Sequence, residues 1–291
     1  MRRPLTPGAR GLGWMVLAQL CFAGMNVCTR LGSAHLPWAE IAAARFLIGA
    51  MIALGLAAVR GVSLRVTDRP GTWRRSVFGT ISAVGTFYAL SSTRIGLGDA
   101  ATLSATAPIF VALLSGPLLG ERVGRHLWLA VALAFLGIVA LLRPSFEVAA
   151  PVAMVATVGA FFYALAMIWL RKIGPGESHE AVVLHFSLVG CAAMVLLALP
   201  RWTWPDLEGG VYLLGAGLGG GGAQLAMTRA YSLQRAAPVT ALSNLGIVFT
   251  YLLALLVFPA RPSGWQLAGS LLVIAATILV GRGARAARQA R

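Results

Sequence analysis

Acidic side chains and lysine are scarce in this chain. Only nine of its 291 residues are Asp or Glu, and all but one of its 24 basic residues are arginine. Charged residues make up 11% of the sequence, whereas 58% of the residues are hydrophobic and the mean hydropathy is +0.80. A soluble domain of this length would alternate apolar and polar faces, so the composition indicates insertion into a lipid bilayer.

Motifs that carry catalysis are also missing from the sequence. It contains no GxSxG, HExxH, CxxC or phosphate-binding loop. Cys21, Cys28 and Cys191 all lie in apolar stretches without the spacing of metal ligands, so we expect them to pack as small apolar side chains, without a disulfide. We therefore expect no enzyme activity, no cofactor and no metal. A membrane-embedded enzyme or scaffold is the alternative of another class.

What the sequence does contain is ten apolar stretches of about 20 residues, the length that a helix needs to cross a bilayer. Strands of a membrane barrel would be about half as long. The sequence therefore predicts an all-α, polytopic membrane protein. The expected helices are 11–30, 38–59, 75–93, 99–119, 125–142, 150–170, 178–199, 209–232, 237–258 and 264–281.

The two halves of the chain resemble each other. Residues 101–104 (ATLS) enter the fourth stretch as residues 239–243 (VTALS) enter the ninth. Each half has an odd number of spans, so the second half must enter the membrane from the opposite side. Two inverted five-helix repeats around a central cavity are typical of secondary transporters that work by alternating access. The predicted divisions are 1–10 (N-terminal segment), 11–143 (first repeat), 150–281 (second repeat) and 282–291 (basic tail).

The arginines indicate orientation. With a cytoplasmic N-terminus, 18 basic residues fall on the cytoplasmic side and five on the other, when Arg45 inside a span is left out. This is the positive-inside pattern, and it places both termini in the cytoplasm. It also explains the net charge of +15 without a nucleic-acid partner, and the lipid bilayer becomes the expected partner. The arginine-rich usage suggests a bacterial inner (plasma) membrane. The oligomeric state stays open, and a monomer is compatible with the sequence.

Short motifs recur in a characteristic order along almost the whole chain. They are Asn26 and Arg30, ARF at 44–46, YAL at 88–90, APIF at 107–110 and LGER at 119–122. With these motifs the chain resembles the drug/metabolite transporter superfamily, specifically its EamA-type ten-helix exporters. The resemblance implies export of small metabolites, commonly amino acids, through a central cavity. The branch that exports aromatic and other neutral amino acids is the most similar one.

Polar and aromatic side chains within the spans are expected to face the interior of the bundle, because exposing polar groups to lipid is costly. At helical spacing they form faces that can line a small-molecule cavity. The candidate substrate-binding residues are Gln19, Phe22, Asn26, Arg45, Tyr88, Ser91, Tyr163, Gln224, Thr228, Asn244 and Tyr251. The alternative for each is packing or hydrogen bonding between helices.

Arg45 has two interpretations. It would lie roughly 10 Å into the second span, where its guanidinium could hold a substrate carboxylate through paired charge-assisted hydrogen bonds. It could instead extend to the nearer interface or pair with Glu40. The sequence favours the structural role and leaves the carboxylate role open.

Hinges are expected where the spans contain helix-weakening residues. Glycines crowd the eighth span at 215, 217 and 219–222, which allows either close helix packing or a flexing segment. Proline in the fourth span should kink it. The hinge candidates are Pro108, Gly219, Gly220, Gly221 and Gly222.

The driving force is inferred from the acidic residues. None of them falls near the expected midplane of the membrane, so a buried carboxylate proton relay is unsupported. His185 is the only histidine deep in a span, and we expect it to be neutral and packed. The sequence therefore favours an uncoupled facilitative carrier. A proton-coupled drug or metabolite exporter is the alternative.

Overall fold

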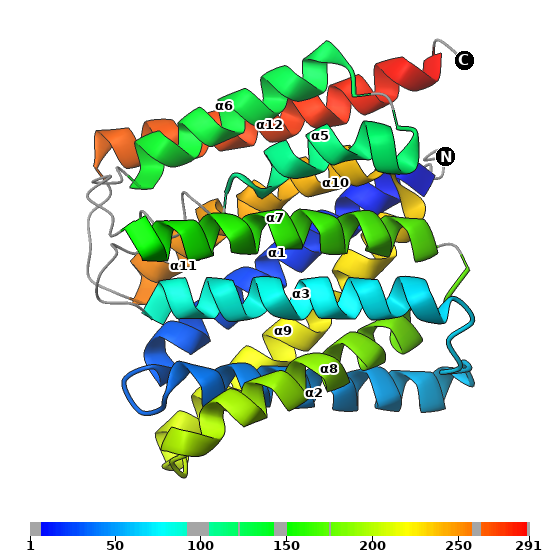
Figure 1. Ribbon diagram of the computed structural model, residues 1–291. Helices are drawn as coiled ribbons and strands as arrows, with labels where there is room; N and C mark the ends of the chain where they lie inside the picture. The colour runs from blue at the N-terminus through cyan, green and yellow to red at the C-terminus, as the bar shows by residue number, and fades with distance from the viewer. Residues whose placement is uncertain are drawn as a thin grey trace.

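The computed structural model describes residues 7–91, 105–121, 123–142, 150–174, 176–257 and 263–289, and all regular elements in these ranges are helical (Figure 1). The elements are α1 Pro7–Gly32, α2 Trp38–Arg60, α3 Arg69–Ser91, α5 Ala107–Leu119, α6 Arg125–Leu142, α7 Ala150–Ile173, α8 His179–Ala198, η1 Leu199–Arg201, α9 Leu207–Leu233, α10 Ala236–Ala241, η2 Leu242–Asn244, α11 Leu245–Val257 and α12 Gly264–Gln289. The predicted all-α fold is confirmed.

The outer surface of the bundle is apolar. Among the described residues, five helices are long and apolar enough to cross a membrane, and three shorter helices are also apolar. Large hydrophobic side chains are left uncovered along them: Val59 is 85% exposed, Leu256 83% and Leu196 69%. Soluble monomers rarely leave so much apolar surface open to water. The protein is therefore a polytopic membrane protein whose exposed apolar side chains face lipid.

The helices of the two halves pack in equivalent pairs. α1 packs along α9, and its counterpart α7 packs along α3. In the same way α2 contacts α9 as α8 contacts α3, and α1 contacts α11 as α7 contacts α5. Two further pairs, α2 with α8 and α6 with α12, each join equivalent helices of the two halves. They lie at opposite edges of the bundle in Figure 1. Exchanging the halves leaves the pattern unchanged, as expected for a duplicated five-span unit.

Each helix of the α2–α8 pair carries a buried glutamate in its first turn. Glu180 in α8 is 4% exposed and accepts a hydrogen bond from Nη1 of Arg60, at the end of α2, at 2.8 Å. Glu40 in α2 is 4% exposed and accepts one from the Thr203 backbone N–H, beyond the end of α8, at 2.7 Å. A carboxylate at a helix N-terminus is stabilised by the helix dipole. Each carboxylate therefore links the start of its own helix to the end of the other helix of the pair.

The ends of α9 and α12 show how the sequence sets helix limits. Asp206 caps α9: its Oδ1 accepts the Gly209 N–H at 2.7 Å, and its Oδ2 lies 3.0 Å from His35 Nδ1. These two contacts, the first above all, lower the pKa of Asp206 below its usual 3.8.

α12 runs on to Gln289, so the expected helix end at 281 is too early, and the basic tail continues the helix. Both chain ends lie at the same end of the bundle (Figure 1).

The glycines of the eighth span belong to a continuous 27-residue helix, α9. A Cβ at Gly219 would meet backbone atoms of Cys21 and Met25 in α1 at 3.0–3.3 Å, and one at Gly221 would meet the Gly49 Cα in α2 at 3.1 Å. The missing side chains let α9 approach both helices closely, as small residues do in membrane bundles. This geometry fits the packing interpretation, and a hinge at Gly219, Gly220, Gly221 or Gly222 stays a prediction.

The helix breaks lie elsewhere. The ninth span was expected to be one helix over 237–258, but it consists of α10, the 3₁₀ turn η2 and α11, with the interruption at Leu242–Asn244. Pro108 was expected to kink the fourth span, but it lies in the first turn of α5, which begins at Ala107. Proline there removes no hydrogen bond of α5 itself. Residues 92–104, the part of the span before α5, lie outside the described residues, so a hinge at Pro108 stays a prediction.

Candidate substrate site

Two of the predicted residues on α1 join it to α11. The Gln19 side chain is 5% exposed, and its amide oxygen lies against Gly246, where a Cβ would collide with it. The Nδ2 of Asn26 donates to Thr250 Oγ1 at 3.1 Å. Both amides therefore serve at least the interhelical role that was weighed against substrate binding. Phe22, between them on the same helix face, turns towards α2.

Arg45 lies in an aromatic and glycine-lined setting. Its guanidinium carbon is 4.8 Å from the Phe46 ring centroid and 5.8 Å from that of Phe22. A Cβ at Gly220 of α9 would come within 2.7 Å of its Cγ and Nε, so the glycine gives the arginine its space. The Nε atom is buried and has no hydrogen-bond partner among the described residues. Arg45 does not pair with Glu40, which bonds to Thr203 instead.

Arg75 was missed by sequence analysis. It was counted among the cytoplasmic arginines at the start of the third span, but α3 begins at Arg69 and Arg75 is buried about 9 Å along it, with 1% exposure. Its guanidinium carbon stacks over Phe186 of α8 at 4.1 Å, and the Phe186 ring meets Phe46 edge-on at 5.2 Å. The Arg45 and Arg75 side chains are thus linked by two contacting aromatic rings.

A row of polar side chains on α9 follows from Gly220 at the helical spacing of three to four residues. Gln224 is 5% exposed and its Nε2 has no partner in the described part of the chain. The Thr228 hydroxyl donates a hydrogen bond to the backbone carbonyl of Gln224 at 2.8 Å. Tyr231 is fully buried and hydrogen-bonds to Thr240 of α10. The row therefore leads from Arg45 towards the second half's broken span.

Tyr163 of α7 joins this row. Its hydroxyl donates to Met227 Sδ at 3.7 Å, and its ring packs against the buried cluster that contains Met227 and Tyr231. Tyr231 was not among the candidate residues predicted from the sequence. Its 0% exposure and its hydrogen bond to Thr240 make it a further candidate. Arg45, Arg75, Tyr163 and Gln224 come from four helices, two in each half.

The remaining candidates are dispersed. Asn244 of η2 is 3% exposed, and its Nδ2 has no hydrogen-bond partner within the described ranges. The Tyr251 hydroxyl is also buried and has no hydrogen-bond partner there. Tyr88 of α3 is 46% exposed, which turns it towards the surface of the bundle. Ser91 ends α3, and its side chain lies outside the described residues. His185 packs edge-on against Trp73 and hydrogen-bonds to Ser76 Oγ at 2.8 Å, as a packed histidine does.

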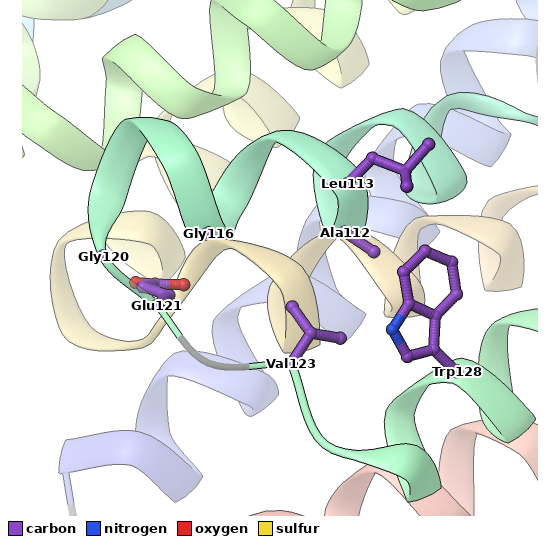
Figure 2. Close-up of a pocket in the computed structure, with 7 residues that line it drawn as sticks. All are labelled: Ala112, Leu113, Gly116, Gly120, Glu121, Val123 and Trp128. Atoms are coloured by element: carbon purple, nitrogen blue, oxygen red, sulfur yellow. The ribbon is translucent and has the colours of Figure 1, made fainter.

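An open groove of about 540 Å³ lies elsewhere on the protein. Figure 2 shows its lining from the end of α5, the following connector and the start of α6: Ala112, Leu113, Gly116, Gly120, Glu121, Val123 and Trp128. None of the predicted site residues is among these. The groove is open at the surface and its lining contains neither Arg45 nor Arg75, so we do not assign the substrate to it.

Glu121, at the edge of this groove, links the two halves. Its Oε1 accepts from Nε of Arg171 at 3.3 Å, and its Oε2 accepts the backbone N–H of Ala236, the first residue of α10, at 3.1 Å. Arg235 Nε lies 3.8 Å from the same carboxylate. Glu121 is only 11% exposed, so these contacts are shielded from water. They join the two halves at the end of the bundle at which α1 begins and α12 ends.

The part of the chain that the structure describes contains no group of three His, Cys, Asp or Glu side chains that could hold a metal ion. The site is instead cationic, aromatic and amide-lined. Such a site can bind and orient an acidic small molecule. It contains no nucleophile paired with a base.

Comparison with known proteins agrees with a membrane carrier. The profile of the EamA-like transporter family matches residues 9–143 and 150–282. A solved crystal structure shares the fold with a TM-score of 0.83 at 21% identity, covering 94% of this chain and 97% of the other. The protein is a polytopic membrane transporter. It belongs to the EamA-like family of the drug/metabolite transporter superfamily, as the resemblance implied.

Relatives in this family differ in what their names say they carry. The pseudopaline exporter CntI of Pseudomonas aeruginosa is 31% identical over 92% of this chain and 94% of its own length. A riboflavin transporter of Vibrio cholerae is 26% identical, covering 91% and 90%. An S-adenosylmethionine uptake transporter of Rickettsia bellii is 22% identical, covering 93% and 92%. Family membership therefore leaves both the substrate and the direction of transport open.

Proposed function

We propose that this transporter exports amino-acid-like metabolites and that Arg45 holds their carboxylate. The observation that carries the proposal is the buried Nε of Arg45, which lacks a hydrogen-bond partner among the described residues and is flanked by Phe22 and Phe46. A buried guanidinium N–H without an acceptor is costly, and a carboxylate is the anion that matches the planar fork of arginine. The aromatic rings would contact an apolar side chain of the substrate, such as that of phenylalanine.

Alternating access is the proposed mechanism, because the two halves pack equivalently and the arginine site lies between helices of both halves. The Glu121 contacts tie the first half to Arg171 and α10 of the second half at one end only. In the proposed cycle they break when the site opens to the cytoplasm. The orientation, a bacterial inner membrane with both termini inside, rests on the arginine distribution and on the common position of the chain ends in Figure 1.

Facilitative transport without ion coupling is the proposed driving mode. The buried carboxylates Glu40 and Glu180 bind helix ends, and each has a hydrogen-bond partner. Neither is available as a proton carrier near Arg45. Accumulation of substrate against its gradient, driven only by an imposed pH gradient across proteoliposomes, would overturn this part and favour the proton-coupled alternative.

The test of the carboxylate role is a transport panel in proteoliposomes with labelled L-phenylalanine, L-tyrosine, L-tryptophan and L-glutamate, and with 2-phenylethylamine, which lacks the carboxylate. We expect transport of at least one amino acid and none of the amine. Arg45→Lys keeps the charge but loses the planar fork, so it should weaken transport about tenfold or more. Unchanged transport by a well-folded Arg45→Lys protein would exclude recognition by the fork.

The matched control is Arg74→Lys. Arg74 is exposed and stacks over Trp169 at 4.6 Å, away from Arg45. Its replacement changes the same residue type in the same part of the protein without touching the site. We expect this variant to transport as the unsubstituted protein does.

A further inference from the structure

Arg75 is the most deeply buried cation that the structure describes, and its surroundings are shaped around it. Its side chain is 1% exposed. The guanidinium lies over the face of Phe186 at 4.1 Å, and a Cβ at Gly79 would collide with its Nη1 atom. Glycine at position 79 therefore leaves room for the guanidinium.

No ion pair compensates this charge within the described ranges. The Nε and Nη1 atoms of Arg75 have no hydrogen-bond partner there, and the ion pairs found among the described residues involve other cations. Cation–π contact with Phe186 offsets part of the cost of burial. It leaves the three N–H donors on Nε and Nη1 unsatisfied, which in a buried site is costly. The arrangement is complete only when an acceptor enters.

A second cation, Arg45, lies on the other side of two contacting aromatic rings. Phe186 stacks on Arg75 at 4.1 Å and meets Phe46 at 5.2 Å, and Phe46 lies 4.8 Å from the Arg45 guanidinium carbon. The Nε of Arg45 also has no hydrogen-bond partner among the described residues. One small molecule that carries two negative groups would supply acceptors to the unsatisfied donors of both arginines.

We propose that Arg75 forms a second anion subsite, and that the preferred substrates are amino-acid-like molecules with two acidic groups. This inference rests on the proposed function, in which Arg45 holds the first carboxylate. The aromatic rings of Phe46 and Phe186 lie between the two subsites and would contact the body of the molecule. The protein would then discriminate strongly between a diacid and the otherwise identical monoamide.

The experiment compares matched pairs of probes that differ in one charge: L-glutamate with L-glutamine, and 4-carboxy-L-phenylalanine with 4-carbamoyl-L-phenylalanine. In proteoliposomes containing the full-length protein we expect at least one diacid to be transported about 10- to 100-fold better than its amide, the range that one charge-assisted hydrogen bond gives. Arg75→Gln should bring the ratio of diacid transport to amide transport down to about one. Arg74→Gln, its exposed neighbour, should keep the preference.

The outcomes separate the two proposals. If no amino acid in either panel is transported, the proposed function fails. If amide and diacid are transported equally by the unsubstituted protein, or if Arg75→Gln lowers both in proportion, the second subsite is refuted while the proposed function stands. Should Arg75→Gln fail to fold, thermal stabilisation of the unsubstituted protein decides: a diacid must raise its melting temperature more than the matched amide does, and equal shifts refute the subsite.

Discussion

Replacing Gly217 with alanine should separate α9 from α2. A Cβ at this position would lie 2.7 Å from Ile48 Cβ and 2.9 Å from Ile48 Cγ1. Carbon atoms in contact prefer about 3.5–4.0 Å, and the Ile48 Cβ is fixed to the α2 backbone. The helices must therefore move apart by about 0.8 Å or more at this point. Overpacking of this kind costs about 1–3 kcal/mol.

Gly222→Ala is the matched control, because a Cβ there meets nothing within 4 Å. Both substitutions gain the same helix propensity, about 1 kcal/mol, so the intrinsic effect cancels between them. We expect Gly217→Ala to be less stable than Gly222→Ala by about 1–3 kcal/mol, or several degrees in the melting temperature. Tryptophan fluorescence during heating of the two purified proteins in the same detergent measures this difference.

Equal melting temperatures for the two variants would refute the close-packing interpretation of the glycines. The same proteins also test the hinge alternative. If the glycine tract flexes during transport, Gly222→Ala should slow transport while raising stability. If the tract only packs, Gly222→Ala should leave the rate unchanged.

Three further predictions concern contacts outside the arginine site. Glu121→Gln should weaken its contacts with the second half by about 1–3 kcal/mol and increase thiol labelling of a cysteine introduced beside Arg171, whereas unchanged labelling would exclude a gating role. Glu180→Gln should lower the melting temperature by a few degrees, because it removes the charge of a buried carboxylate that pairs with Arg60, and an unchanged melting temperature would contradict that assignment. Since the pKa of Asp206 is lowered in the folded state, its contribution to stability is present above pH 3.8 and is lost as the pH falls through the folded-state pKa. Asp206→Asn should remove this part of the acid destabilisation in a pH series of melting temperatures, and an identical acid profile would contradict it.

Hydropathy predicted the membrane class and most helix limits, because each apolar stretch must satisfy its backbone groups within a helix. The expected and observed limits of α6 agree at Arg125 and Leu142, and the first residue of α2 agrees at Trp38. The break at Leu242–Asn244 was not predictable in this way, because apolar residues continue through it. Neighbouring helices stabilise a broken span, and here Tyr231 of α9 hydrogen-bonds to Thr240 of α10. Because such contacts belong to the tertiary structure, hydropathy along the sequence does not reveal them.

The candidate site was predicted only in part, for a related reason. Arg45 stood alone in an apolar span and was therefore conspicuous. Arg75 follows Arg74 next to a loop, so the pair had the sequence pattern of a membrane interface. Only the packing of Phe186 over Arg75 and the space at Gly79 distinguish the buried arginine from its exposed neighbour. Glycine at position 79 was a signal that the sequence contained, but its meaning depends on the facing helix.

The most direct measurement of the central claim is counterflow exchange. Proteoliposomes are preloaded with an unlabelled amino acid that the unsubstituted protein transports, and uptake of the labelled compound is followed without any ion gradient. A carrier whose Arg45 holds the carboxylate should accumulate label transiently, and so should Arg74→Gln, whereas Arg45→Gln should not. Equal transient accumulation by a folded Arg45→Gln protein would contradict the account.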